Sequence, residues 1–326
     1  MKSQRGVGKA VSIVSTIFKF NPIMASLLPL LFVFAIQPWQ VRSEQYNNIF
    51  ILAGQSNMAG RGGVSETTAT WDGVVPPESQ PKASILRLNA KLEWVEAEEP
   101  LHADIDVTKT NGVGPGMAFA NTILEKRPGF GVVGLVPCAI GGTNISEWER
   151  GKVHYTRMMK RVKASLQGGG GLQALLWYQG ESDTLLLSDA QSYRTRLGKF
   201  FLDLRADLNS PLLPIVQVAL ASGEGPYIET VREAQLDMDL LNLRTVDAKG
   251  LPLGPDGLHL TTQAQVHLGQ VMADAFLQFV PTSLPKNNVL PIHNGAPPTR
   301  PHNGASQIYM IPISITFLTI VSLTLL

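Results

Sequence analysis

Residues 48–53 read NIFILA, and Gly54-Gln55-Ser56-Asn57-Met58 follows at once. A short apolar run with β-branched residues that ends at a glycine is typical of a buried strand. Similar runs follow at 132–138, 172–178, 213–218 and 243–246. Apolar residues recur at helical spacing in the segments between and after them, at 116–126, 154–166, 190–208, 228–241 and 261–279. Strand and helix therefore alternate along the chain.

This alternation predicts an α/β fold. Apolar strands joined through helices form a parallel sheet that is covered on both faces, so we expect a three-layer α/β/α sandwich around a central five-stranded parallel sheet. Residues 61–111, with paired short strands near 84–95, are expected to be an insertion after the first strand. In such folds the ligand site lies beyond the carboxyl ends of the strands.

Polar residues follow four of the five predicted strands. The first strand is followed by Ser56, the second by Gly141-Gly142-Thr143, the third by Gln179-Gly180-Glu181-Ser182-Asp183 and the fifth by Asp256-Gly257-Leu258-His259. A serine, a histidine and a carboxylate at one edge of a sheet suit acyl transfer. The imidazole takes the proton of the hydroxyl, and the carboxylate orients the imidazole.

These residues can be given roles in that chemistry. Ser56 is the candidate nucleophile, His259 the candidate base and Asp256 its partner. The backbone N–H groups of Ser56 and Gly142, with the side-chain amide of Gln179, are candidate donors to the oxyanion that attack would create.

Four ordered blocks resemble a known family. GQSNM at 54–58, GGTNISEW at 141–148, WYQGESD at 177–183 and DGLH at 256–259 are similar to the sialate O-acetylesterase-type carbohydrate esterases, a branch of the SGNH hydrolases. The resemblance covers roughly residues 48–279. It implies the SGNH-hydrolase fold, removal of acetyl groups from sugar hydroxyls, and no metal or organic cofactor. It also implies the same roles for Ser56, Asp256 and His259, an oxyanion glycine at 142 or 141, and a glutamine at 179 where many SGNH enzymes carry asparagine.

Other interpretations of these residues remain open at this point. The chain could be a catalytically silent carbohydrate-binding protein on the same fold, or an esterase for other small acyl esters. Glu181 and Asp183 could be a glycosidase pair or could brace their loop. Trp148 and Trp177 could stack on a sugar or lie in the core. Asn144-Ile145-Ser146 is a glycosylation sequon beside the candidate oxyanion glycine, and we expect it to be empty or directed away.

The composition limits the classes of partner that the folded part can bind. The 326 residues are 44% hydrophobic and 16% charged, with 27 basic and 26 acidic residues. Residues 44–281 hold 20 of these bases and all 26 acids, a net charge of about −6. Nucleic-acid binding requires a basic footprint, so no nucleic-acid partner is expected. The single cysteine, Cys138, excludes an intrachain disulfide.

The two ends of the sequence predict export. Residues 1–43 hold five bases, no acid and the apolar run at 22–36, as a signal peptide does. Residues 282–307 are rich in Pro, Asn and Gly and resemble a stalk, with a candidate lipid-attachment site near Asn294. The apolar residues 308–326 end the chain without a basic flank, which favours a GPI signal over a membrane helix. We therefore expect residues 44–281 to be an esterase domain tethered at the cell surface that acts on acetylated carbohydrate.

Overall fold

The computed structural model describes two stretches of chain, residues 47–65 and 67–280. The predicted signal peptide, the stalk with its attachment site near Asn294, and the apolar tail lie outside the described residues. Within the described stretches, no helix is both long enough and apolar enough to cross a membrane.

The run NIFILA forms the central strand of the sheet, β1 (Asn47–Gly54). It pairs in parallel with β6 (Val132–Pro137) on one side and with β7 (Gly170–Tyr178) on the other. The predicted later strands are β8 (Ile215–Ala219) and β9 (Leu243–Asp247), which extend the sheet beyond β7 in parallel. Ile49–Ala53 are fully buried, as expected for a strand covered on both faces.

The sheet has seven strands rather than the predicted five. The order is β5-β4-β6-β1-β7-β8-β9. The two short strands expected inside the insertion, β4 (Ile85–Leu88) and β5 (Trp94–Glu96), join the main sheet beside β6. β4 is parallel to β6, and β5 is antiparallel to β4. Ile85 and Leu88 bury their side chains completely, and this burial favours attachment to the core over a separate hairpin.

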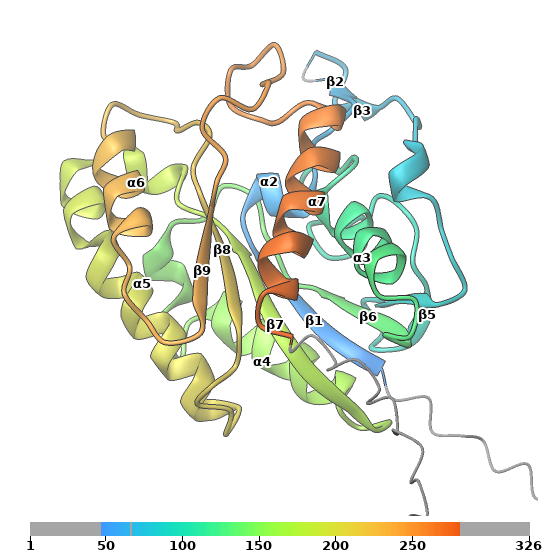
Figure 1. Ribbon diagram of the computed structural model, residues 1–326. Coiled ribbons are helices and arrows are strands. Elements are labelled where there is room, and N and C mark those ends of the chain that lie inside the picture. The colour runs from blue at the N-terminus through green and yellow to red at the C-terminus, as the bar shows by residue number, and fades with distance from the viewer. Residues whose placement is uncertain (1–46, 66, 281–326) are drawn as a thin grey trace, which may run out of the picture. The chain divides into compact units, whose positions relative to one another are not determined.

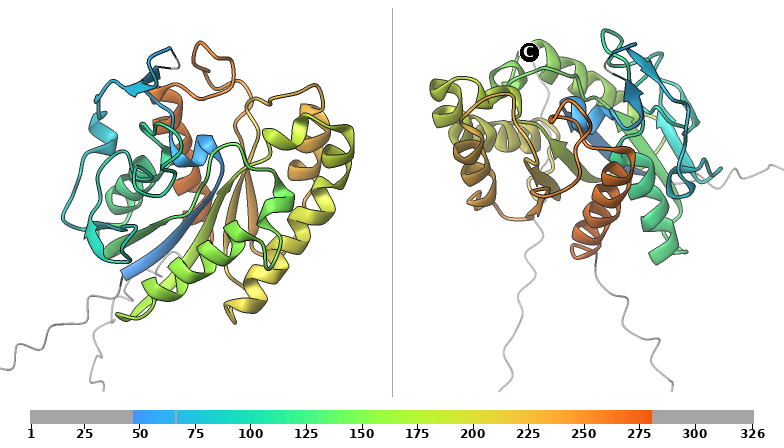
Figure 2. Two further views of the ribbon diagram at one scale, coloured as in Figure 1. Left: turned by 180° about the vertical axis from the view of Figure 1, so that it is seen from behind. Right: turned by 90° about the horizontal axis from the view of Figure 1, so that it is seen from above.

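Helices cover both faces of the sheet, so the three-layer α/β/α architecture is confirmed (Figures 1 and 2). One face carries α3 (Pro115–Lys126) and α7 (Thr262–Leu277), which pack against each other. The other carries α4 (Val153–Ser165), α5 (Leu187–Asp207) and α6 (Ile228–Leu236).

The helix predicted at 228–241 is shorter than expected, because α6 ends at Leu236. Arginine side chains bind carbonyl groups of the segment that follows α6. Arg194 donates to the carbonyl of Asp237 at 2.7 Å, and Arg205 donates to the carbonyl of Leu241 at 2.7 Å. These bonds satisfy the chain outside a helix.

An aromatic cluster joins β1 to the helices of one face. The ring centroid of Phe50 lies 4.9 Å from that of Phe119 on α3 and 4.9 Å from that of Phe276 on α7, with edge-to-face geometry in both pairs. Such pairs contribute about 0.5–1.5 kcal/mol each beyond area burial. The strand that leads to Ser56 is therefore anchored firmly to these helices.

Candidate active site

The turn after β1 places Ser56 at the edge of the sheet. Ser56 is the first residue of the short helix α2 (Ser56–Ala59) and is 5% exposed. Gly54 precedes it with φ of +133°, and a Cβ on Gly54 would lie 1.9 Å from the carbonyl oxygen of Tyr178. Only glycine allows the ends of β1 and β7 to approach this closely. The glycine of the GQSNM block therefore fixes where the serine stands.

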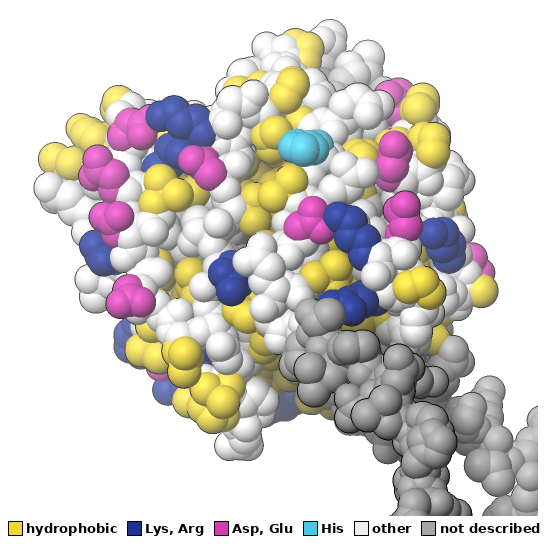
Figure 3. Space-filling view, viewed as in Figure 1, with side chains coloured by type: hydrophobic (Ala, Val, Ile, Leu, Met, Phe, Trp, Pro, Cys, Tyr) yellow, Lys and Arg dark blue, Asp and Glu magenta, His cyan; other side chains and the backbone are white. Residues whose placement is uncertain are grey.

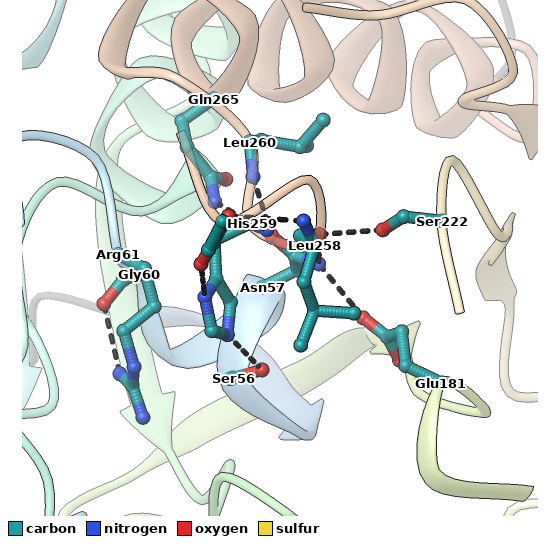
Figure 4. A network of polar contacts seen from close by, with 11 residues as sticks. Ser56, Asn57, Gly60, Arg61, Glu181, Ser222, Leu258, His259, Leu260 and Gln265 are labelled. Carbon is teal, nitrogen blue, oxygen red and sulfur yellow. Dashed lines mark hydrogen bonds and ion pairs between the residues drawn. The ribbon is translucent and has the colours of Figure 1, made fainter. Parts of the chain in front are cut away.

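Ser56, His259 and Asp256 form a continuous relay, and Figure 4 shows its contact between Ser56 and His259. The Nε2 atom of His259 lies 2.9 Å from Oγ of Ser56, and its Nδ1 atom lies 2.6 Å from Oδ2 of Asp256. The serine and the histidine are 203 positions apart in the chain. The structure thus brings Ser56, which follows the first predicted strand, together with Asp256 and His259, which follow the fifth.

Asp256 is held in its ionised form. Partial burial alone would raise its pKa, but the backbone N–H groups of Leu258 and His259 donate to its Oδ1 atom at 2.9 and 3.0 Å, and the ring of His259 faces Oδ2. Together these hydrogen bonds lower the pKa of Asp256 below its usual value. A carboxylate that stays charged can stabilise an imidazolium as it forms.

The loop that carries His259 is fixed on both sides of the histidine by one side chain, that of Asn57 (Figure 4). The backbone N–H of Leu260 donates to Oδ1 of Asn57 at 2.9 Å, while Nδ2 of Asn57 donates to the carbonyl of Leu258 at 3.4 Å. Ser222, which follows β8, also donates to the carbonyl of Leu258, at 2.5 Å. The residue next to the candidate nucleophile therefore positions the candidate base.

Glu181 fixes the orientation of that amide. Its Oε1 atom accepts from Nδ2 of Asn57 at 2.8 Å, and its Oε2 atom is buried without a partner. Burial raises the pKa of Glu181 to about 7, although the hydrogen bond from Asn57 opposes this. Glu181 is fully buried and so does not face the solvent as a glycosidase carboxylate would.

Two backbone N–H groups are available near Ser56 to stabilise an oxyanion. Among the described residues, the structure records no acceptor for the N–H of Ser56 or of Gly142. The N–H of Gly141, by contrast, donates to Oδ2 of Asp106 at 3.2 Å. Asp106 is itself held by Arg61 in a buried ion pair of 2.5 Å. Of the two glycines considered in the sequence, Gly142 is therefore the one with a free donor, and its φ of +71° suits glycine.

Gln179 does not point toward Ser56 as the sequence predicted. Its Nε2 atom donates to Oδ2 of Asp183 at 2.6 Å and to the carbonyl of Thr143 at 2.9 Å. Its Oε1 atom accepts from the hydroxyl of Tyr193 at 3.1 Å, and the whole residue is buried. Gln179 thus ties the loops after β6 and β7 together beneath the site and, in this arrangement, has no amide hydrogen to offer an oxyanion.

Asp183 shares this bracing role. Both of its carboxylate oxygens accept from the backbone N–H of Ile145, at 3.1 and 3.0 Å. Burial raises the pKa of Asp183 to about 7, and the hydrogen bond from Gln179 opposes the rise. Ile145 belongs to the sequon, whose Asn144 accepts a hydrogen bond from Ser146 at 2.7 Å. The expectation that the sequon at Asn144 is empty or directed away from the site stays a prediction.

The candidate catalytic cavity, beside Ser56 and His259, has a volume of about 420 Å³ and is lined by both polar and apolar groups. Ser56, Gly142 and His259 form one wall, and Thr108, Lys109, Thr110 and Glu224 lie among the other lining residues. Trp148 and Trp177 do not line it, because both are fully buried in the core with ring centroids 5.3 Å apart. Neither tryptophan is placed to stack on a bound sugar. Within the described part of the chain, no group of three or more His, Cys, Asp or Glu residues is arranged to hold a metal ion.

Sequence reasoning missed the residues that hold the site together. Besides Asn57, Gln55 is fully buried, and its Oε1 atom accepts from the backbone N–H of Gly180 at 3.2 Å. Both residues stand inside the GQSNM block beside Ser56. Two amides that flank a candidate nucleophile were the available signal, since amides can join loops that meet at a strand end.

Comparison with known proteins shows the family of the chain. A family model described as "Carbohydrate esterase, sialic acid-specific acetylesterase" matches residues 46–278. The chain belongs to this carbohydrate esterase family. The family resemblance drawn from the four blocks is thereby confirmed.

Similar proteins span the same part of the chain. A protein described as "Probable carbohydrate esterase At4g34215" from Arabidopsis thaliana is 58% identical over 236 residues, which are 71% of this chain and 90% of that one. The X-ray structure of the Arabidopsis thaliana protein AT4G34215 is 57% identical, with a TM-score of 0.69 over 72% of this chain and 98% of that one.

More distant solved structures share the fold alone. NanS is 18% identical, with a TM-score of 0.59 over 72% of this chain and 98% of that one. The carbohydrate acetylesterase XAC1771 from Xanthomonas citri is 19% identical, with a TM-score of 0.52 over 71% of this chain and 56% of that one.

Proposed function

We propose that the protein is a serine carbohydrate esterase that removes O-acetyl groups from sugars or polysaccharides through an acyl-enzyme on Ser56. The observation that carries this proposal is the unbroken relay from Oγ of Ser56 through His259 to Asp256, with contacts of 2.9 and 2.6 Å. Membership of a carbohydrate esterase family supports the substrate class.

Each step uses groups of the protein and water. Oγ of Ser56 attacks the acetyl carbon while Nε2 of His259 takes the hydroxyl proton. The N–H groups of Ser56 and Gly142 donate to the oxyanion, and each such donor is worth about 3 kcal/mol. The sugar hydroxyl leaves with the proton from His259. Water, deprotonated by His259, then attacks the acyl-enzyme, and acetate leaves as Ser56 regains a proton.

Substitution of the relay tests the mechanism. We expect Ser56→Ala and His259→Ala each to lower kcat for acetyl-ester hydrolysis by about 10⁴-fold or more, with unchanged circular dichroism. Asp256→Asn is expected to cost less than His259→Ala. Acetate release from acetylated polysaccharides measures all three variants, and undiminished turnover in Ser56→Ala would refute the acyl-enzyme.

Two further measurements separate this function from the alternatives. An organophosphonate labels only an activated serine, so a silent carbohydrate-binding protein would stay unlabelled while still binding sugar. A comparison of acetylated sugars with long-chain esters tests the other small-ester function. The threonines, lysine and glutamate around the cavity favour hydroxyl-rich substrates over long acyl chains.

We further propose that the protein is exported and tethered to the outer cell surface by a GPI lipid. This rests on the sequence of residues 1–43 and 282–326. Treatment of intact cells with a phosphatidylinositol-specific phospholipase is expected to release the esterase activity into the medium. Activity that stays with the membranes would instead indicate a transmembrane tail.

A further inference from the structure

A second cavity, of about 270 Å³, lies at the carboxyl ends of β4 and β6 and takes no part in the relay. The loop 140–142 separates it from the catalytic cavity. Ile140 lines the second cavity, whereas the next two residues, Gly141 and Gly142, line the catalytic one. A ligand long enough to pass this loop would reach both cavities.

The charges around the second cavity leave two cations without a partner. Asp104 is already bound, since its Oδ1 atom contacts Arg87 at 2.7 Å and its Oδ2 atom accepts from the N–H of Ala90 at 2.7 Å. Arg157 and Lys160 of α4 are exposed, and among the described residues the structure records no hydrogen bond or ion pair for either. They are three positions apart and so lie on one side of the helix.

The third basic residue of this wall, Arg161, is occupied by the fold. Its guanidinium donates to the carbonyls of Pro137 at 2.7 Å, Asn89 at 3.0 Å and Leu88 at 2.5 Å. It fastens α4 to the ends of β4 and β6 and so shapes the cavity. The positive charge offered to a ligand therefore comes from Arg157 and Lys160.

A buried histidine adds an unused acceptor. His154 is 8% exposed, its Nε2 atom lies 3.5 Å from Oε2 of Glu147, and its Nδ1 atom is buried without a partner. Burial lowers the pKa of His154; the charge of Glu147 opposes this and that of Arg157 adds to it. The ring lines the cavity, and its Nδ1 atom is a hydrogen-bond acceptor when the proton is on Nε2, the atom that faces Glu147.

We propose that this cavity binds a carboxylate-bearing sugar of an acidic polysaccharide whose acetyl ester is cleaved at Ser56. The inference rests on the proposed esterase function and narrows its substrate to uronate-containing chains. Arg157 and Lys160 attract the carboxylate, and Nδ1 of His154 accepts from a sugar hydroxyl. The volume suits one sugar rather than a longer segment.

This attraction is local. The side of the molecule seen in Figure 3, which carries α7, shows acidic and basic side chains interspersed. In α4 the bases Arg157, Lys160, Arg161 and Lys163 occur without an acid between Val153 and Ser165. An acidic polymer would therefore be drawn to the α4 side although residues 44–281 are net acidic.

The test compares two double variants of equal charge. Arg157→Gln with Lys160→Gln removes the two free cations, whereas Lys152→Gln with Lys163→Gln removes two exposed charges that do not line the cavity. With acetylated polygalacturonate, we expect KM for acetate release to rise about fivefold or more in the first variant and little in the second. With the methyl-esterified form of the same polymer, KM should stay unchanged in both. The wild-type KM for the acidic polymer should also rise with salt.

Binding measured without hydrolysis keeps this inference separate from the proposed function. In a Ser56→Ala background, titration calorimetry with an unacetylated galacturonate oligomer is expected to show the same loss on replacement of Arg157 and Lys160. That result would support the subsite even if no polymer were hydrolysed. Equal binding by the two double variants, or an equal loss of affinity in both, would overturn it.

Discussion

Asn57 couples the candidate nucleophile to the candidate base through one buried amide. It follows Ser56 directly and bonds to the backbone on either side of His259. We therefore expect its effect on activity to be one of position, because its amide binds Glu181 and the backbone rather than the hydroxyl of Ser56 or the ring of His259.

Replacement of this amide should show that role in kcat rather than in KM. We expect Asn57→Ala to lower kcat about 100-fold, because small displacements of a catalytic group are costly. The free energy of unfolding should fall by about 1–3 kcal/mol through the lost buried hydrogen bonds. Steady-state kinetics and the rate of organophosphonate labelling measure the effect.

A matched control distinguishes position from stability. Asn121 on α3 is also a buried asparagine, with hydrogen bonds to the carbonyls of Gln80 and Met117 at 3.1 Å each. Asn121→Ala should destabilise the fold to a similar degree and leave kcat unchanged. If both variants lost the same turnover per folded molecule, Asn57 would have only a structural role.

At this scale the sequence predicted which residues meet but not which way each one faces. Ser56, Asp256 and His259 are chemically distinctive residues that follow strands, so topology brings them together. Gln179 is equally well placed in the sequence, but its direction is set by Asp183, which accepts from its Nε2 atom, and by Tyr193, which donates to its Oε1 atom. Such partners, which bind both ends of one amide, are not visible in a pattern of spacing.

At the scale of elements, the positions of the strands and helices of the parallel core were predicted closely, because their apolar patterns extend over many residues. The short strands β4 and β5 were recognised as strands but not as part of the sheet. With four and three residues, they carry too few alternating positions to show which neighbour they pair with. The attachment of β4 depends on contacts with β6, which lies more than forty positions away, and β5 joins the sheet through β4.

The segment between β5 and α3 contains a buried acid that links stability to pH. Glu99 is 7% exposed and accepts from the N–H groups of Leu101 at 3.0 Å and Gly114 at 3.3 Å. Burial raises its pKa from 4.5 to about 8, although the two backbone hydrogen bonds oppose this. The folded state therefore holds a proton that the unfolded state releases, and this contribution to stability is lost as pH rises toward 8.

Glu99→Gln should remove that dependence. We expect the free energy of unfolding to decline between pH 6.5 and 8.0 by about 1.5 kcal/mol less in the variant than in the wild type. Urea denaturation at the two pH values measures the difference. The exposed neighbour provides the control, since Glu98→Gln should decline as the wild type does. An identical decline in Glu99→Gln would show that Glu99 is ionised throughout.

For the molecule as a whole, the parallel sheet gives the domain two unlike poles. The relay and both cavities lie where β1, β4 and β6 end. The described chain begins at the start of β1 and ends just after α7, and both points lie at the opposite pole (Figure 1). A resin, a fusion partner or a fluorescent label attached directly at Asn47 or Val280 would thus lie on the side of the domain away from the relay. In immobilised preparations made in this way, the entrance to the cavity at Ser56 should stay open to large, slowly diffusing polymers.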